Sequence, residues 1–275
     1  GAEPLLFLDY IAVPKIDKAM LQQIVEGVAE GCRMSGGALL GGETANMPDL
    51  YAPGDFDLAG FCVGAVELKR AIQPTRVKPG DLVLGLASSG VHSNGYSLVR
   101  RVVKEAGLDL HAVYEELFTP GKSKSKAKKV PAKKNGKGAN GSARPTLGQV
   151  LLTPTRIYAD SIVRLQRGYK VKNVISGMAH ITGSGLAENL VRSVPNNCDA
   201  HIDRSSWPVP PVFTFLQKHG NIDDAEMKRV FNLGIGYCLI VRPTFAEAIK
   251  ERLEKLGETV YIIGEMVKGT GRVHD

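Results

Sequence analysis

The sequence has no apolar run long enough to cross a membrane and little that could crosslink it. None of its apolar stretches approaches the roughly 20 residues that span a bilayer, and no signal-peptide pattern opens it. Four cysteines, Cys32, Cys62, Cys198 and Cys238, lie far apart, without CxxC spacing and among apolar neighbours. We therefore expect reduced core cysteines, no membrane partner and a cytoplasmic location.

Acidic and aromatic residues are missing from the segment 121–145, which carries eight lysines and one arginine. Outside this segment 26 of the 35 basic residues remain against 28 acidic ones, so the formal charge of +7 comes from the segment. Its composition predicts a disordered lysine-rich insert at about 119–146. Without aromatics for base stacking, the insert argues against nucleic acid as a partner. A nuclear-import-like signal or a weak polyanion contact is the alternative.

Strand-like and helix-like segments alternate along the chain, which is typical of an α/β or α+β protein. A stripe of apolar residues at helical spacing follows Asp17, a plausible N-cap, and Gly36 ends it. Thr153 and Pro154 have the order that opens a helix, with proline near the first turn. At 275 residues with 43% hydrophobic content, the chain is long enough for two domains.

The most informative stretch is DLVLGLASSGVHSNGYS, residues 81–97. Its apolar start predicts a buried strand, its middle a turn of small polar residues, and its end a helix. A helix that follows such a turn presents backbone amides to an anion. His92 in the turn has an ordinary pKa close to neutral pH and could transfer protons, although a histidine in a turn is more often a cap or a surface group.

Two further glycine-rich segments are candidates for phosphate binding. GGET, residues 41–44, places the Glu43 carboxylate beside backbone that a ligand can approach closely, and Mg²⁺ on nucleotides is usually held by one or two carboxylates. A tight turn with a solvated acid is the alternative. In AHITGSGLAEN, residues 179–189, Gly183 and Gly185 flank Ser184 just before a predicted helix, so amides and a hydroxyl face an incoming anion.

Seven long strings together resemble the phosphoribosylformylglycinamidine cyclo-ligase, or aminoimidazole ribonucleotide synthetase, family of purine biosynthesis. They keep the family's order over nearly the whole chain except the insert. The strings are GAEPLLFLDY (1–10), GGETANMPDLY (41–51), DLAGFCVGAVE (57–67), SSGVHSNGYSLVR (88–100), LLTPTRIYA (151–159), AHITGSGLAEN (179–189) and FNLGIGYCLIV (231–241). Two positions differ from the family pattern, which usually has glycine at Ser184 and threonine at Val230.

The resemblance implies a two-domain aminoimidazole ribonucleotide synthetase-like fold of the α/β (α+β) class. Residues 1–71 would be the C-terminal part of an N-terminal ATP-binding and dimerisation domain. Residues 72–275 would form a C-terminal domain with a mixed sheet and helices. A glycine-rich family segment with an aspartate and a lysine, which belongs to the ATP site, is not in this sequence, so we expect an incomplete first domain. In the full-length protein we expect a homodimer.

The implied reaction is ATP-dependent, Mg²⁺-assisted cyclisation of formylglycinamidine ribonucleotide to aminoimidazole ribonucleotide. The candidate residues fall into four groups. The catalytic candidates are His92 and Asn94; the ATP or phosphate ligands are Gly41, Gly42, Glu43, Thr44, Ser93, Gly183, Ser184 and Gly185; weaker substrate candidates are Asp9, His180 and Asn232; and the metal ligand is Glu43.

Two other functions remain open at the level of sequence. One is a different ATP enzyme of the same superfamily, such as a thiamine-phosphate or selenophosphate kinase, with the same cleft but without these long strings. The other is a catalytically incomplete fragment, or a module of a larger multifunctional purine enzyme, that acts as a structural or partner-binding unit. Substrate-dependent release of ADP would separate these possibilities.

Overall fold

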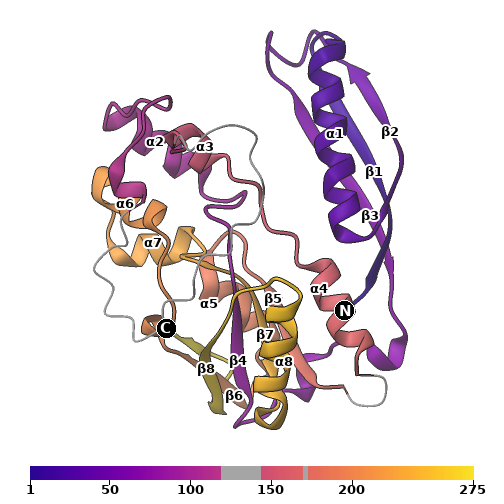
Figure 1. Ribbon diagram of the computed structural model, residues 1–275, viewed down its shortest axis with the longest axis vertical. Helices are drawn as coiled ribbons and strands as arrows, with labels where there is room; N and C mark the ends of the chain where they lie inside the picture. The colour runs from indigo at the N-terminus through magenta and orange to yellow at the C-terminus, as the bar shows by residue number, and fades with distance from the viewer. Residues whose placement is uncertain (119–143, 170–172) are drawn as a thin grey trace. The chain divides into compact units, whose positions relative to one another are not determined.

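The computed structural model describes residues 1–118, 144–169 and 173–275, so most of the expected insert lies outside the described residues. The chain forms two compact units (Figure 1). Unit 1 comprises residues 1–71 and 157–173, and unit 2 comprises residues 72–156 and 174–275. The stretch 157–173 thus groups with the first 71 residues although it follows much of unit 2 in the sequence, and the expected single boundary after Ala71 stays a prediction.

Unit 1 is a three-stranded sheet with two helices. Strand β1 (Glu3–Val13) lies between β2 (Ala38–Asn46), which is parallel to it, and β3 (Asp57–Ala65), which is antiparallel. Helix α1 (Lys18–Ser35) begins where predicted, because the Asp17 carboxylate accepts hydrogen bonds from two first-turn amides. It ends at Gly36, whose φ of 81° is the left-handed conformation that glycine adopts without strain.

The prediction that a helix begins at Thr153 and Pro154 is wrong, because helix α4 (Ala159–Arg167) begins five residues after Pro154. Two side chains hold the preceding segment in an irregular conformation. The Thr153 hydroxyl donates back to the carbonyl of Val150, and the Ser89 hydroxyl donates to the carbonyl of Pro154. The first bond is local and competes with a helical turn, as hydroxyl side chains near their own backbone do, and the second ties the segment to a distant loop.

Unit 2 contains a six-stranded mixed sheet with the order β5-β7-β4-β8-β6-β9. The strands are β4 (Leu82–Ala87), β5 (Ile175–His180), β6 (Cys198–Ile202), β7 (Ile235–Val241), β8 (Val260–Lys268) and β9 (Val273–His274). The helices are α2 (Tyr96–Glu105), α3 (Leu147–Leu151), α5 (Gly185–Leu190), α6 (Pro211–Gly220), α7 (Asp224–Val230) and α8 (Pro243–Lys255). The expected mixed α/β fold class is therefore confirmed.

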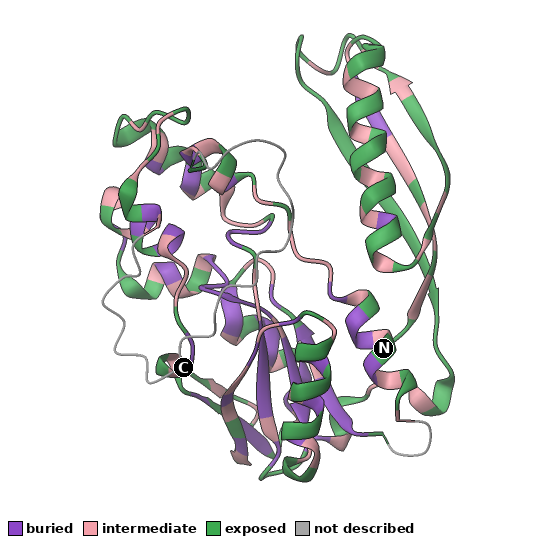
Figure 2. Ribbon diagram, in the orientation of Figure 1, coloured by how far each residue is buried: buried purple, intermediate pink, exposed green. Residues whose placement is uncertain are grey.

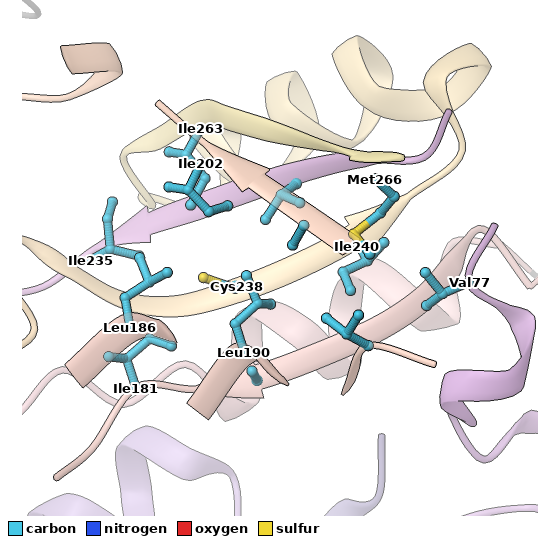
Figure 3. Packing of buried hydrophobic residues seen from close by; sticks show 14 of the residues in the cluster. Val77, Ile181, Leu186, Leu190, Ile202, Ile235, Cys238, Ile240, Ile263 and Met266 are labelled. Atoms are coloured by element: carbon cyan, nitrogen blue, oxygen red, sulfur yellow. The ribbon is translucent and has the colours of Figure 1, made fainter. Parts of the chain in front are cut away.

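The core of unit 2 lies on both faces of this sheet. On one face, side chains from α5, β7 and β8 pack together (Figure 3). Trp207, whose indole is fully buried, belongs to the same cluster. Strand residues alternate between faces, so Leu84, Leu86 and Leu239 point to the other face, against which α8 packs. A second cluster of buried residues joins α2, α3, α6 and α7.

No helix in the described part of the chain is long and apolar enough to cross a membrane. All four cysteines are unpaired, and Cys62 alone among them is exposed. The expectation of core cysteines holds for Cys32, Cys198 and Cys238 and is wrong for Cys62, which lies on the surface of β3.

Candidate functional site

Three loops meet at one edge of the sheet of unit 2. Strands β4 and β5 both pair antiparallel with β7, so they run parallel to each other and end at the same edge, where β7 begins. The register places Ala87 opposite Ile235 and His180 opposite Tyr237. The loops 88–95, 181–184 and 231–234 therefore lie together, and the sheet fixes their relative positions.

The loop 88–95 is a tight turn built around a buried histidine. His92 is 4% exposed and has a φ of 63°, an uncommon conformation for a residue other than glycine. Its Nε2 accepts the amide N–H of Ser89 at 3.1 Å and lies 3.5 Å from the amide nitrogen of Arg156. The imidazole thus holds its own turn together and links it to the segment 153–156.

This environment fixes the charge of His92. Burial, and then the nearby His180 and Arg156, lower the pKa of its imidazole to about 4. A backbone amide can only donate, so Nε2 is an acceptor and the neutral ring carries its hydrogen on Nδ1. At neutral pH the ring is therefore an uncharged group with a defined tautomer, rather than an imidazolium ready to donate a proton.

Ser93 and Asn94 continue the turn toward solvent. Ser93 is exposed, and its hydroxyl lies 2.8 Å from the hydroxyl of Thr155. Asn94 is half-buried, and a Cβ placed on Gly183 would lie 3.6 Å from its Oδ1, so the first two loops are in contact. Gly95 then starts α2 with a φ of 79°, and the ring of Phe231 leaves no room there for a side chain.

Asn232 lies beneath this turn and is 4% exposed. Its Nδ2 donates to the carbonyls of Gly90 at 2.9 Å and Val91 at 3.2 Å. Its Oδ1 accepts the Ser88 hydroxyl and the Gly234 amide, each at 2.8 Å. All four hydrogen-bonding positions of the amide are used within the protein. We had expected a weak substrate candidate here, and the structure places Asn232 inside the scaffold of the turn.

The loop 181–184 has the same construction. Ser184 has a φ of 71°, and Gly185 follows with 70° at a place where a Cβ would lie 1.9 Å from the Lys228 carbonyl. Asn189, 2% exposed, donates from Nδ2 to the carbonyls of Gly183 at 2.8 Å and Gly185 at 2.7 Å. The serine thus occupies a left-handed position that glycine would adopt at lower energy.

His180 ends β5 at the same edge and is exposed. Its ring lies 5.9 Å from that of Tyr237, and partial burial lowers the pKa of its imidazole. It is close enough to His92 to contribute to the lowered pKa of that residue. The edge thus presents two imidazoles that neutral pH leaves largely uncharged.

Sequence reasoning missed the part played by residues 153–156. This segment crosses the turn and is bound to it through Ser89, His92 and Ser93. Arg156 anchors it: Nε donates to the buried carboxylate of Glu258 at 2.6 Å, and the guanidinium also donates to the Gly257 carbonyl at 2.8 Å. The string LLTPTRIYA was the available signal, but nothing in it indicates that Arg156 would find an acid about a hundred residues away.

The GGET residues lie in unit 1, inside strand β2. Gly41, Gly42, Glu43 and Thr44 form an exposed stretch of strand and not a turn. Gly42 pairs with Asp9 across the parallel ladder, and a Cβ on Gly42 would lie 2.2 Å from the Asp9 carboxylate, so glycine leaves space for that acid. The Glu43 carboxylate accepts the Thr44 amide at 3.1 Å.

The donor set for a metal is small. Among the described residues, no group of three or more histidine, cysteine, aspartate or glutamate side chains is placed to hold a metal ion. Glu43 offers one exposed carboxylate. That fits Mg²⁺ carried on nucleotide phosphates, which keeps most of its ligands as water and phosphate oxygens, and does not fit an all-protein cage.

The structure thus divides the predicted site residues between two groups. Unit 2 brings together His92, Ser93, Asn94, His180, Gly183, Ser184, Gly185 and Asn232. Unit 1 holds Asp9, Gly41, Gly42, Glu43 and Thr44. The edge of unit 2 offers hydroxyls, backbone amides and neutral imidazoles, which can bind an anion and position a polar substrate but bring no permanent positive charge of their own.

Two family models match the chain. The N-terminal domain of AIR synthase related proteins matches residues 1–66, and the C-terminal domain matches residues 78–275. Curated relatives named phosphoribosylformylglycinamidine cyclo-ligase are 45% identical in Bacillus velezensis, 44% in Bacillus subtilis and 46% in Gloeobacter violaceus. Each match covers 98% of this chain and 70–72% of the relative.

Solved structures share the fold at low sequence identity. A thiamine-monophosphate kinase from Stenotrophomonas maltophilia matches with a TM-score of 0.63 and 16% identity, over 99% of this chain and 72% of that one. A hydrogenase maturation protein HypE in complex with ATP matches with a TM-score of 0.62 and 17% identity, over 99% and 70%. These likenesses support the fold, while the much closer relatives separate the chain from the kinases.

Proposed function

The chain belongs to the phosphoribosylformylglycinamidine cyclo-ligase family, and from that membership we propose how its own residues serve the reaction. Its function is the ATP-dependent cyclisation of formylglycinamidine ribonucleotide to aminoimidazole ribonucleotide in purine biosynthesis. About 45% identity over 98% of the chain carries this assignment. The alternative of a purely structural or partner-binding module is not favoured.

The chemistry requires an amide to become an electrophile. ATP transfers its γ-phosphoryl group to the amide oxygen of the substrate, the amidine nitrogen attacks the activated carbon, and phosphate leaves with that oxygen. The products are aminoimidazole ribonucleotide, ADP and phosphate. The protein must hold two polyanions close together, so positioning and electrostatic stabilisation supply most of the rate.

We assign the edge of unit 2 to the substrate and its phosphate. The loops after β4 and β5 present the amides that precede α2 and α5, together with the hydroxyls of Ser93 and Ser184. Asn94 lies between the two loops and can donate to one substrate group while accepting from another. These roles are supported by the shared position of the loops at one end of the sheet.

His92 takes a different role from the one its type first indicates. With its pKa lowered to about 4 and Nε2 engaged by Ser89, the ring does not deliver a proton at neutral pH. We propose that it fixes the turn from within, as a buried and uncharged ring. His180, which lies exposed beside it, is the better candidate for direct substrate contact.

Unit 1 is proposed to serve the nucleotide. Mg²⁺, when bound with ATP, would neutralise phosphate charge and favour transfer of the phosphoryl group, and Glu43 is the residue that would hold it. Gly41, Gly42 and Thr44 would let the phosphates approach the backbone beside it, and Asp9 lies against Gly42. The exposed strand and the single carboxylate support this assignment.

The finer biological setting is also a proposal. We propose a homodimer of the full-length protein, because unit 1 leaves apolar side chains such as Leu40 and Phe61 about two-thirds exposed. We propose a cytoplasmic location on the basis of four unpaired cysteines. We also propose that the chain is a module of a larger multifunctional enzyme, which the length of the purified natural protein would test.

A coupled assay of ADP release by the full-length protein tests the function. With ATP, Mg²⁺ and formylglycinamidine ribonucleotide we expect ADP and aminoimidazole ribonucleotide in equal amounts. With thiamine monophosphate as the control substrate we expect no ADP. Release of ADP only with the control would contradict the assignment and favour the kinase.

A further inference from the structure

Two buried asparagines hold the loops of the unit 2 site from beneath. Asn232 is bonded to Gly90 and Val91 in the first loop, and Asn189 to Gly183 in the second loop and to Gly185 at the start of α5. Both side chains are at least nine-tenths buried, and both point their Nδ2 at a pair of backbone carbonyls. The orientation of the Asn232 amide is unambiguous, because the Gly234 amide can only donate to Oδ1.

The loops that they hold are strained. The described residues include four with positive φ that are not glycine: His92, Ser184, Asn221 and Leu233. Three of these, all but Asn221, lie in the loops at the edge of the unit 2 sheet. A side chain in this conformation is costly and persists only where the surroundings enforce it, and such strain concentrates at functional sites.

We infer that Asn189 and Asn232 are positioning residues of the cyclo-ligase reaction, which keep strained substrate-binding loops in the active arrangement without touching substrate. The inference rests on the proposed function of this edge. Each asparagine replaces the hydrogen bonds that water would otherwise give to two loop carbonyls, and so directs the loop amides outward. Each asparagine also uses its Oδ1: that of Asn232 accepts from Ser88 and Gly234 at the ends of β4 and β7, and that of Asn189 accepts from the Thr182 hydroxyl at 3.2 Å.

An isosteric exchange separates this role from packing. Asn232→Asp and Asn189→Asp keep the volume but turn an oxygen, in place of an NH₂, toward two carbonyl oxygens. A loop displaced by about 1 Å can cost 100-fold in rate, so we expect kcat/KM for formylglycinamidine ribonucleotide to fall about 10- to 100-fold. The matched control is Asn221→Asp, which makes the same change at an exposed positive-φ residue after α6, and we expect it to keep wild-type kcat/KM.

A second pair of variants keeps the test decisive if an aspartate variant does not fold. Asn189→Ala removes the hold on the second loop, and Ser184→Gly removes the strain that the hold opposes. Measured against Ser184→Gly alone, which already lacks the serine hydroxyl, we expect Asn189→Ala to lower kcat/KM by a factor at least about 3-fold smaller than in the wild-type protein, because glycine adopts the left-handed conformation without help. A purely packing role for Asn189 predicts no such rescue.

The outcomes divide cleanly. Loss of kcat/KM in the folded aspartate variants supports the inference, and wild-type kcat/KM in folded Asn232→Asp and Asn189→Asp overturns it. Where Asn189→Asp does not fold, the second pair of variants decides in its place: rescue by Ser184→Gly supports the inference, and absence of rescue overturns it. If the wild-type protein itself releases no ADP with formylglycinamidine ribonucleotide, the proposed function fails instead, and the wild-type arm of the assay shows which of the two has happened.

Discussion

The sheets of the two units differ in what covers them. Every residue of β3 in unit 1 is exposed, including Phe61 at 65%, whereas the central residues of β4 in unit 2 are buried on both faces (Figure 2). Unit 2 therefore has a core of its own. Unit 1 presents apolar strands that need a further surface to cover them.

The backbone differs in the same way. Within the described part of unit 1, positive φ occurs only at glycines, Gly36 and Gly54. Unit 2 places side-chain-bearing residues in that conformation, and it has the surrounding structure to hold them there. The strained loops that we propose for the substrate thus lie in the unit whose core is complete.

Removal of the Trp207 side chain should have the largest effect on stability, because it lies in the buried core that distinguishes unit 2 from unit 1. The indole is fully buried, and its N–H donates to the Leu233 carbonyl at 3.0 Å. We expect Trp207→Ala to lower the free energy of unfolding by about 3–5 kcal/mol. Because the sequence has a single tryptophan, unfolding in urea should be followed by circular dichroism. A loss below about 1 kcal/mol would show that this core does not stabilise unit 2.

Acid is expected to weaken unit 2 through His92. Its pKa is about 4 in the folded protein and 6.5 ordinarily, so the unfolded chain binds the extra proton between these values. The contribution of the neutral His92 ring to the free energy of unfolding is fully present above about pH 6.5. The free energy of unfolding should fall by about 3 kcal/mol as the pH is lowered to about 4. The variant His92→Gln keeps an acceptor but does not titrate, so its unfolding free energy should vary less over this range. Equal slopes for the two proteins would contradict the buried, neutral imidazole.

Ser184→Gly tests the strain in the second loop. Glycine adopts a φ of 71° without the steric cost that serine bears there, so we expect a gain of about 0.5–1 kcal/mol in unfolding free energy. Gly80, which has positive φ in a turn with no atom near its missing side chain, provides the matched control. Gly80→Ser should lose stability by a similar amount. A destabilising Ser184→Gly would mean that the loop is not strained.

Phe61→Ala in unit 1 should have the smallest effect. Its ring is mostly exposed in this chain, so we expect a change in unfolding free energy within about 0.5 kcal/mol. In the full-length protein the same variant tests the proposed dimer, since sedimentation would then detect a shift toward monomer. A large loss of stability in the chain by itself would show that the β3 face is already covered.

The sequence predicted the elements better than the site. The apolar stretch before Ser88 and the Asp17 cap located β4 and α1, because burial period and capping are local signals. The resemblance located the loops of unit 2. Local reasoning could not show that GGET is extended strand, since glycines allow either conformation.

The roles within the site depended on contacts that are distant in sequence. The sequence offers Asn232 only as a weak substrate candidate, and the antiparallel pairing of β4 with β7 brings it to the turn some 140 residues earlier. His92 looked titratable at neutral pH until its burial and the Ser89 amide were known. Arg156 was not considered, because its partner Glu258 lies beyond β7 and α8.

The central claim is that the loops 88–95 and 181–184 bind the substrate together. Amide hydrogen exchange of the full-length protein, measured with and without formylglycinamidine ribonucleotide and a non-hydrolysable ATP analogue, tests it most directly. We expect amide exchange to become slower in the peptides from both loops when the substrate is added. Exchange in α8, on the other side of the sheet, should not change. Protection of neither loop, in a protein that converts ATP to ADP when this substrate is present, would show that the loops do not bind it.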